Sequence, residues 1–211
     1  MTQHDPDRRF RAALERARAE WSEVDLYAAA MHSACQLSPA TGGDRSGAVT
    51  VPLFGRTHRV THPGGEVTAQ DTGKLAHVSL AILLLHYLLK ADGTRPADRW
   101  VAFRELPDGL FYAQAFAGHA EAVIAQAFGS DLDAFASAAR HLAGTPLDLA
   151  DASFRFEALP RLPMAVLVWE GDDEFPGRAR VLFDANASHC LPTEDLSGLG
   201  DWLAHRLVRH R

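Results

Sequence analysis

The N-terminal part of the chain shows a helical pattern of apolar residues. From Asp5 to about Ala34, apolar side chains recur at every third or fourth position, which predicts an amphipathic helix that could break near Ser22. Residues 38–47 are rich in Gly, Ser, Pro and Asp and are typical of a loop. We therefore expect a helical segment over residues 1–45 and a single α+β domain over residues 46–211.

Three short segments after this loop have strand character. Residues 48–53, 57–60 and 66–69 are separated by turn residues, and they predict a small antiparallel meander. Residues 74–90 are apolar on nearly every side, which predicts a central buried helix.

The rest of the chain alternates helical and strand patterns in blocks. Helices are expected over 111–128 and 132–143 and from Thr193 onward, and strands over 153–157, 164–169 and 178–183. The continuous apolar run at 164–169 indicates a strand that is covered on both faces. Blocks of helices beside blocks of short strands indicate an α+β fold, with small antiparallel sheets packed against a buried central helix and flanking helices.

Charge and cysteine content narrow the function classes. The 21 Lys and Arg against 27 Asp and Glu give a net charge of −6, and such a chain lacks the basic footprint of a nucleic-acid-binding protein. Two cysteines, Cys35 and Cys190, are too few for a four-cysteine metal centre and are typical of a reducing compartment. The N-terminus has no signal-peptide pattern, and the longest apolar run, 78–89, is shorter than the roughly 20 residues of a membrane span. We expect a soluble cytoplasmic protein without a membrane partner.

The segment from Glu170 to Pro176 is the most unusual in composition. It carries four carboxylates within five residues, at the end of the apolar strand. Asp172 and Glu174 could bind a hard cation such as Mg²⁺ or Ca²⁺, or the segment could be a solvated acidic loop. The aromatic Phe175 after the acidic run suggests that the loop is anchored.

Two histidines are candidate metal ligands. His86 lies within the apolar helix beside Tyr87, where it is either a hydrogen-bonded core residue or a ligand to a metal. His189 lies at a junction between strand and helix, and Asp184 before it could accept a hydrogen bond from the ring.

Arg104 and Glu105 precede a Pro-Asp-Gly turn. An arginine in this position could bind a carboxylate or phosphate, or it could pair with the acidic loop. If the two segments meet, a polar cleft would contain Arg104, Glu105, Asp172, Glu174 and His189. The chain has no G-x-S-x-G, P-loop or G-x-G-x-x-G motif.

Several motifs resemble one family in their order along the chain. They are 52–60 (PLFGRTHRV), 83–89 (LLLHYLL), 104–109 (RELPDG), 162–176 (with VWEGDDEFP at its end), 182–184 (LFD) and 189–196 (HCLPTEDL). Over roughly residues 45–200, the sequence resembles the DUF3786 family of domains without an assigned activity. The resemblance implies a link to iron–sulfur modules or corrinoid metabolism, with which some relatives are associated, although this chain has no cysteine cluster.

Three functions follow as hypotheses. The first is an accessory protein that binds a small molecule between the His86 helix and the acidic loop, and the family's associations suggest a tetrapyrrole, either a corrinoid or haem. The second is an enzyme that uses Asp172, Glu174 and His189 in metal-assisted or acid–base chemistry. The third is a structural or interaction module. The sequence leaves the oligomeric state open.

Overall fold

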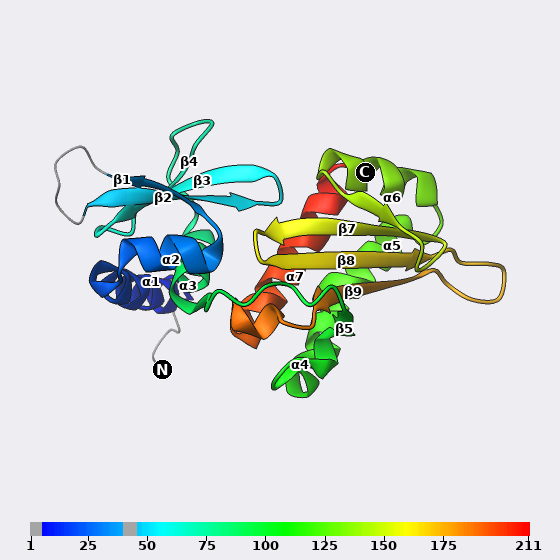
Figure 1. The fold of residues 1–211 in the computed structure, drawn as a ribbon. Coiled ribbons are helices and arrows are strands. Elements are labelled where there is room, and N and C mark those ends of the chain that lie inside the picture. Colours follow the sequence, from blue (N-terminus) through cyan, green and yellow to red (C-terminus); the bar gives the residue numbers. More distant parts are fainter. Residues whose placement is uncertain (1–5, 40–45) are drawn as a thin grey trace. The chain divides into compact units, whose positions relative to one another are not determined.

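The computed structural model describes residues 6–39 and 46–211 (Figure 1). The chain forms two compact units, of which the first ends at Thr94 and the second spans Arg95–Arg211. The described part contains helices and two antiparallel sheets, one in each unit, which confirms the predicted α+β class.

The two compact units divide the chain differently from the division expected at residues 45 and 46. Part of the expected boundary loop, residues 40–45, lies outside the described residues. The strand before it pairs with the strand after it, with Gln36 opposite Thr50. This pairing places the end of the N-terminal segment and the meander in the same unit.

The first unit packs three helices with one four-stranded sheet in its described part. The strands follow the order β1-β2-β3-β4. The elements are α1 (Pro6–Glu23), α2 (Leu26–Ser33), β1 (Gln36–Pro39), β2 (Gly47–Leu53), β3 (Arg56–His62), β4 (Val67–Ala69) and α3 (Val78–Lys90). Both α1 and α2 pack against α3, in which residues 80–85 are all buried, so the central buried helix is present as predicted.

Two boundaries in the first unit have local causes. The helix break falls between Glu23 and Leu26, where Asp25 Oδ1 accepts hydrogen bonds from the N–H groups of Tyr27 (2.9 Å) and Ala28 (3.0 Å) and so begins α2. The helix predicted from residue 74 begins only at Val78. Residues 74–76 instead pair with β4, since Ala76 N donates to Val67 O over 2.9 Å and Leu75 forms an antiparallel bridge with Thr68.

The second unit contains a five-stranded sheet of order β5-β9-β8-β7-β6. Its elements are β5 (Trp100–Ala102), η1 (Phe103–Glu105), α4 (Gly109–Phe116), η2 (Ala117–Glu121), α5 (Ala122–Phe128), α6 (Leu132–His141), β6 (Thr145–Leu147), β7 (Ala152–Leu159), β8 (Leu162–Trp169), β9 (Arg178–Asp184), η3 (Ala187–His189) and α7 (Thr193–Arg209). Every residue of β8 except Trp169 is buried, as its apolar run predicts. Helices α5 and α6 pack against the sheet, and α7 packs against both of them (Figure 1).

The single helix expected over 111–128 contains an irregular turn. It runs from Gly109 to Phe128 as α4, a π-helical turn (η2) and α5. A π turn adds a residue to the helical repeat, and such turns are frequent at functional sites. This turn carries His119 and also Glu121, which lines the candidate site.

Candidate functional site

The π turn directs two polar side chains to two different neighbours. Glu121 contacts strand β9, and His119 contacts helix α7. The added residue shifts the helical phase between the two ends of the segment, so α4 and α5 present different faces to their surroundings. The turn therefore joins the sheet and the last helix through side chains.

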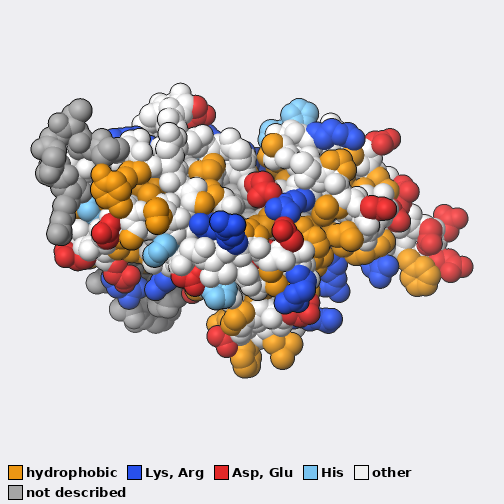
Figure 2. All heavy atoms as spheres, viewed as in Figure 1, with side chains coloured by type: hydrophobic (Ala, Val, Ile, Leu, Met, Phe, Trp, Pro, Cys, Tyr) orange, Lys and Arg blue, Asp and Glu red, His pale blue; other side chains and the backbone are white. Residues whose placement is uncertain are grey.

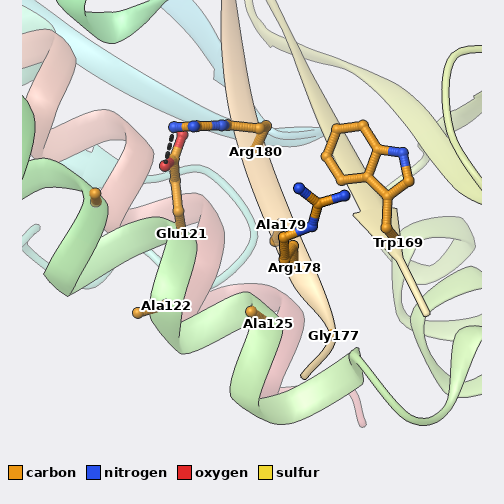
Figure 3. A pocket seen from close by; sticks show the side chains of 9 residues that line it. Glu121, Ala122, Ala125, Trp169, Gly177, Arg178, Ala179 and Arg180 are labelled. Carbon is orange, nitrogen blue, oxygen red and sulfur yellow. Dashed lines mark hydrogen bonds and ion pairs between the residues drawn. The ribbon is translucent and has the colours of Figure 1, made fainter. Parts of the chain in front are cut away.

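Glu121 binds the side of β9 that faces away from β8, at a point that β5 does not cover. One carboxylate oxygen, Oε1, accepts a hydrogen bond from Val181 N over 3.2 Å, and the other, Oε2, accepts from Arg180 Nη1 over 2.9 Å (Figure 3). The Glu121 side chain is only 9% exposed, whereas that of Arg180 is 54% exposed. A buried carboxylate is destabilising unless it is hydrogen-bonded or paired, and these two contacts supply both forms of compensation.

A pocket of about 390 Å³ opens between this helix and the strand. Three alanines from η2 and α5 supply small apolar side chains, and β9 supplies two arginines. The residues that line it are Ala117, Glu121, Ala122, Ala125, Trp169, Gly177, Arg178, Ala179 and Arg180. Its volume lies in the lower part of the range of small-molecule sites, about 300–1,000 Å³.

The two arginines of the pocket have different partners. Arg180 reaches toward the helix and Glu121, while Arg178 turns toward Trp169, with its Cζ atom 5.6 Å from the centre of the indole ring (Figure 3). Guanidinium groups stack favourably on aromatic rings and keep their donors available at the ring edge. Because Glu121 offsets one of the two cations, the lining carries a net charge of +1.

One end of the pocket is closed by a contact between two glycines. A Cβ atom at Gly177 would collide with the backbone of Gly129, so a side chain at this position would force the strand away from the end of α5. The neighbouring Gly171 N donates to Gly129 O over 2.8 Å, which holds the start of the acidic loop against the same helix end. Figure 3 shows Gly177 at the entry of β9, beside Ala125.

His119 lies in a polar group with three residues of α7. Its Nε2 atom is 3.3 Å from Ser197 Oγ and its Nδ1 atom is 3.6 Å from Asp201 Oδ1, which also lies 3.2 Å from His205 Nδ1. The distance to Asp201 is too long for a good hydrogen bond. The contacts of His119 with Ser197 and Asp201 connect the π turn to α7, and we call this connection the tether.

The candidates His86 and Tyr87 both lie on α3 of the first unit. His86 is half-buried, and Tyr87 is fully buried and donates its hydroxyl to Ser33 O over 2.7 Å. The acidic loop belongs to the second unit, so the two halves of the expected tetrapyrrole pocket come from different units. The role of His86 as a ligand stays a prediction.

The loop between β8 and β9 is acidic and exposed, and acidic side chains gather at this end of the second unit in Figure 2. Asp172 orders it by accepting from the N–H groups of Glu174 (2.9 Å) and Phe175 (2.7 Å). The bonds from Phe175 N and Glu174 N hold the pKa of the Asp172 carboxyl below its usual range. The expectation that the aromatic residue anchors the loop is wrong, because Phe175 is 67% exposed. Backbone contacts of Asp172 and Gly171 order the loop instead.

The remaining candidates have structural contacts. Glu105 accepts a hydrogen bond from Ala102 N over 2.7 Å, while Arg104 is exposed. The fully buried Asp184 accepts from Ala97 N and Asn186 N through Oδ1, and within the described residues its Oδ2 atom has no partner. His189 is exposed on η3, and its pairing with Asp184 stays a prediction.

No group of three or more His, Cys, Asp or Glu residues is arranged to hold a metal ion in residues 6–39 and 46–211. The expected metal ligands His86 and His189 belong to different units. No helix in the same part of the chain has the length and apolar character to cross a membrane.

The pocket residues Glu121, Trp169, Arg178 and Arg180 were not among the candidates from the sequence. The sequence contains only a weak indication of these residues. Arg178 and Arg180 alternate with buried residues along a strand, so they share one face, and Glu121 is a lone carboxylate in an alanine-rich helix. The π turn that aims Glu121 at the strand has no such sequence signal.

Fold and site together define an α+β protein with a small, basic pocket at the edge of an antiparallel sheet. The family described as Domain of unknown function (DUF3786) matches residues 25–206, and the chain belongs to this family. The resemblance seen in the sequence motifs is thereby confirmed. No curated protein and no solved structure matches the chain.

Proposed function

We propose that this chain is an accessory ligand-binding protein that holds a small anionic molecule in the pocket between α5 and β9. The observation that carries the proposal is that Arg178, Arg180 and the Trp169 ring line one pocket together with a group of alanines. Guanidinium groups bind carboxylates and phosphates through paired hydrogen bonds, and an indole ring supplies apolar contact. A ligand with an anionic head and a short apolar body suits such a lining.

The experiment is a binding screen of the full chain with small carboxylates and phosphates, read by thermal shift and calorimetry. A ligand at 100 times its Kd should stabilise the protein by about 2.7 kcal/mol. Ala125→Leu, which fills the pocket with a good helix former, and Arg178→Gln should both weaken binding. Arg209→Gln, an exposed arginine near the end of α7, is the matched control and should bind normally.

The proposal fails if no anion in the screen shifts the unfolding temperature. It also fails if Ala125→Leu binds an active ligand as tightly as the unaltered chain does, since the ligand would then lie elsewhere. Unchanged far-ultraviolet circular dichroism of each variant separates loss of binding from loss of fold.

The tetrapyrrole suggested by the family resemblance is proposed as a ligand within the same accessory role. It is supported by His86, a half-buried imidazole among the apolar residues of α3. A visible spectrum recorded with added haem or cobalamin should show a new band that is lost in His86→Ala. No spectral change and no thermal shift with either compound would remove the tetrapyrrole from the proposal.

The alternative proposal is a metal-assisted or acid–base enzyme at Asp172, Glu174 and His189. It predicts stoichiometric Mg, Ca, Mn or Zn in elemental analysis of the purified protein. The alternative of a structural or interaction module predicts that Asp172→Asn and Glu174→Gln weaken no ligand. A cytoplasmic location and the lack of a nucleic-acid partner stay predictions from the sequence.

A further inference from the structure

The hydrogen-bonding direction of β9 follows from three contacts along its outer side. Ala185 N donates to Arg99 O over 2.8 Å, Phe183 is paired with Val101 of β5, and Val181 N donates to Glu121. In an antiparallel strand, alternate residues direct N–H and C=O to the same side. The odd-numbered residues of β9 therefore direct their backbone N–H and C=O groups away from β8. At Ala179, these two groups point into the pocket.

The part of this edge that faces the pocket is short. Strand β5 covers β9 only at residues 182–184, because the chain turns into η1 after Ala102. Glu121 caps the next outward position, Val181. At the other end, the backbone of Gly177 lies against that of Gly129. Ala179 lies between these two closed ends, so the edge offers one donor and one acceptor to a ligand.

A single donor–acceptor pair at a strand edge matches one residue of an added strand. Such a residue beside Ala179 would donate its N–H to Ala179 C=O and accept from Ala179 N–H with its own carboxyl oxygen. Arg178 and Arg180 flank this position on one face of the strand and are about 7 Å apart along it. In an N-acylated amino acid the accepting oxygen belongs to the carboxylate, whose second oxygen would lie within reach of a guanidinium on either side.

We infer that the pocket binds a small N-acylated amino acid, with its amide N–H on Ala179 C=O and its carboxylate between Ala179 N–H and the guanidinium of Arg178 or Arg180. This inference rests on the proposed function and names the ligand class of the same pocket. The alanines at 117, 122 and 125 set the space for the acyl group and a short side chain. Because the edge is closed after one residue, a longer peptide gains no further strand contacts.

The experiment compares three probes of nearly equal shape by NMR titration of the full, backbone-assigned chain. N-acetylalanine has both groups, 2-acetoxypropionate replaces the amide N–H by an ester oxygen, and the methyl ester of N-acetylalanine removes the carboxylate charge. N-acetylalanine should shift the Ala179 amide resonance. Each of the other two probes should bind about tenfold more weakly, since 2-acetoxypropionate lacks the N–H donor and the methyl ester lacks the charged acceptor.

Propionate is the fourth probe and separates this inference from the proposed function. If propionate binds as tightly as N-acetylalanine and the Ala179 resonance does not move, the amide inference is overturned while the anion pocket stands. If neither N-acetylalanine nor propionate binds but another anion does, the inference is overturned and the anion pocket stands. If no anion binds, both are overturned. An octapeptide that ends in alanine should bind no more than tenfold tighter than N-acetylalanine, and much tighter binding would overturn the small-molecule assignment.

Discussion

The two units treat their buried polar groups differently. In the first unit, Trp21 donates its Nε1–H to Thr61 O over 2.8 Å, and Tyr87 donates its hydroxyl to Ser33 O over 2.7 Å. Both are neutral donors on large buried rings, and both join distant segments through a backbone carbonyl. In the second unit, a carboxylate, Glu121, is buried against a strand edge and is shared between Val181 and Arg180.

The neutral buried rings stabilise the fold, whereas the buried carboxylate of Glu121 belongs to a candidate binding site. A neutral ring with one satisfied hydrogen bond adds apolar burial without electrostatic penalty. A buried carboxylate is stable only with its partners in place, and one of those partners, Arg180, is half exposed beside a pocket. Mutations at Trp21 and Tyr87 should therefore mainly change stability, and mutations around the pocket should mainly change binding.

The largest expected effect is on Trp21. Trp21→Ala should lower the free energy of unfolding by about 3–5 kcal/mol, because it removes a fully buried ring and its hydrogen bond. Trp169→Ala, on the partly exposed end of β8, should lower it much less and weaken anion binding instead. Urea unfolding followed by circular dichroism measures both. Equal losses of stability in the two variants would contradict the comparison.

The next effect in size is on Glu121. Glu121→Ala leaves the N–H of Val181 buried without its acceptor, which should lower the free energy of unfolding by about 1–3 kcal/mol. Glu121→Gln keeps an acceptor for Val181 and should recover most of that loss. It also frees Arg180, so anion binding should become tighter. If Gln destabilises as strongly as Ala, the ion pair with Arg180 and not the strand cap is the main contribution.

The sequence predicts the elements that form the cores of both units, but it does not predict the pocket. The alternation along β2 and β3, the apolar run of β8 and the apolar helix α3 all identify their elements, because burial on one or both faces leaves a period in the sequence. The pocket leaves no period. It depends on a π turn that aims Glu121 and on the point where β5 leaves β9, and both are results of tertiary packing.

The candidates drawn from the sequence were mostly charged residues in loops. Asp172 and Glu105 use their carboxylates to order nearby backbone, which a count of charges does not distinguish from ligand binding. Arg178 and Arg180 lie inside a predicted strand and are not among the candidates from the sequence. Their strand and its pattern could be predicted, but the open edge between them could not.

A smaller, pH-dependent effect belongs to the first unit. His58 is 2% exposed, and burial, together with the nearby charge of Arg56, lowers the pKa of its imidazole. Protonation is then easier in the unfolded chain than in the folded one. The free energy of unfolding should therefore fall as the pH drops below about 6.5, the usual value for histidine.

Urea unfolding between pH 5 and pH 8 measures this dependence. His58→Leu should reduce the slope, and His77→Gln, at an exposed cap position, should leave it unchanged. A slope in His58→Leu that equals that of the unaltered chain would assign the dependence to other groups.

The smallest expected effect is on the other side of the π turn. Ser197→Ala removes the hydroxyl that lies 3.3 Å from His119 Nε2, and it should lower the free energy of unfolding by only about 0.5 kcal/mol, since water can reach the half-exposed imidazole. Anion affinity should stay unchanged, because Glu121 keeps both of its contacts with β9. A loss of affinity in Ser197→Ala without a change in stability would show that α7 positions the pocket through His119. The two sides of the turn would then form one functional unit, and the tether would belong to the site.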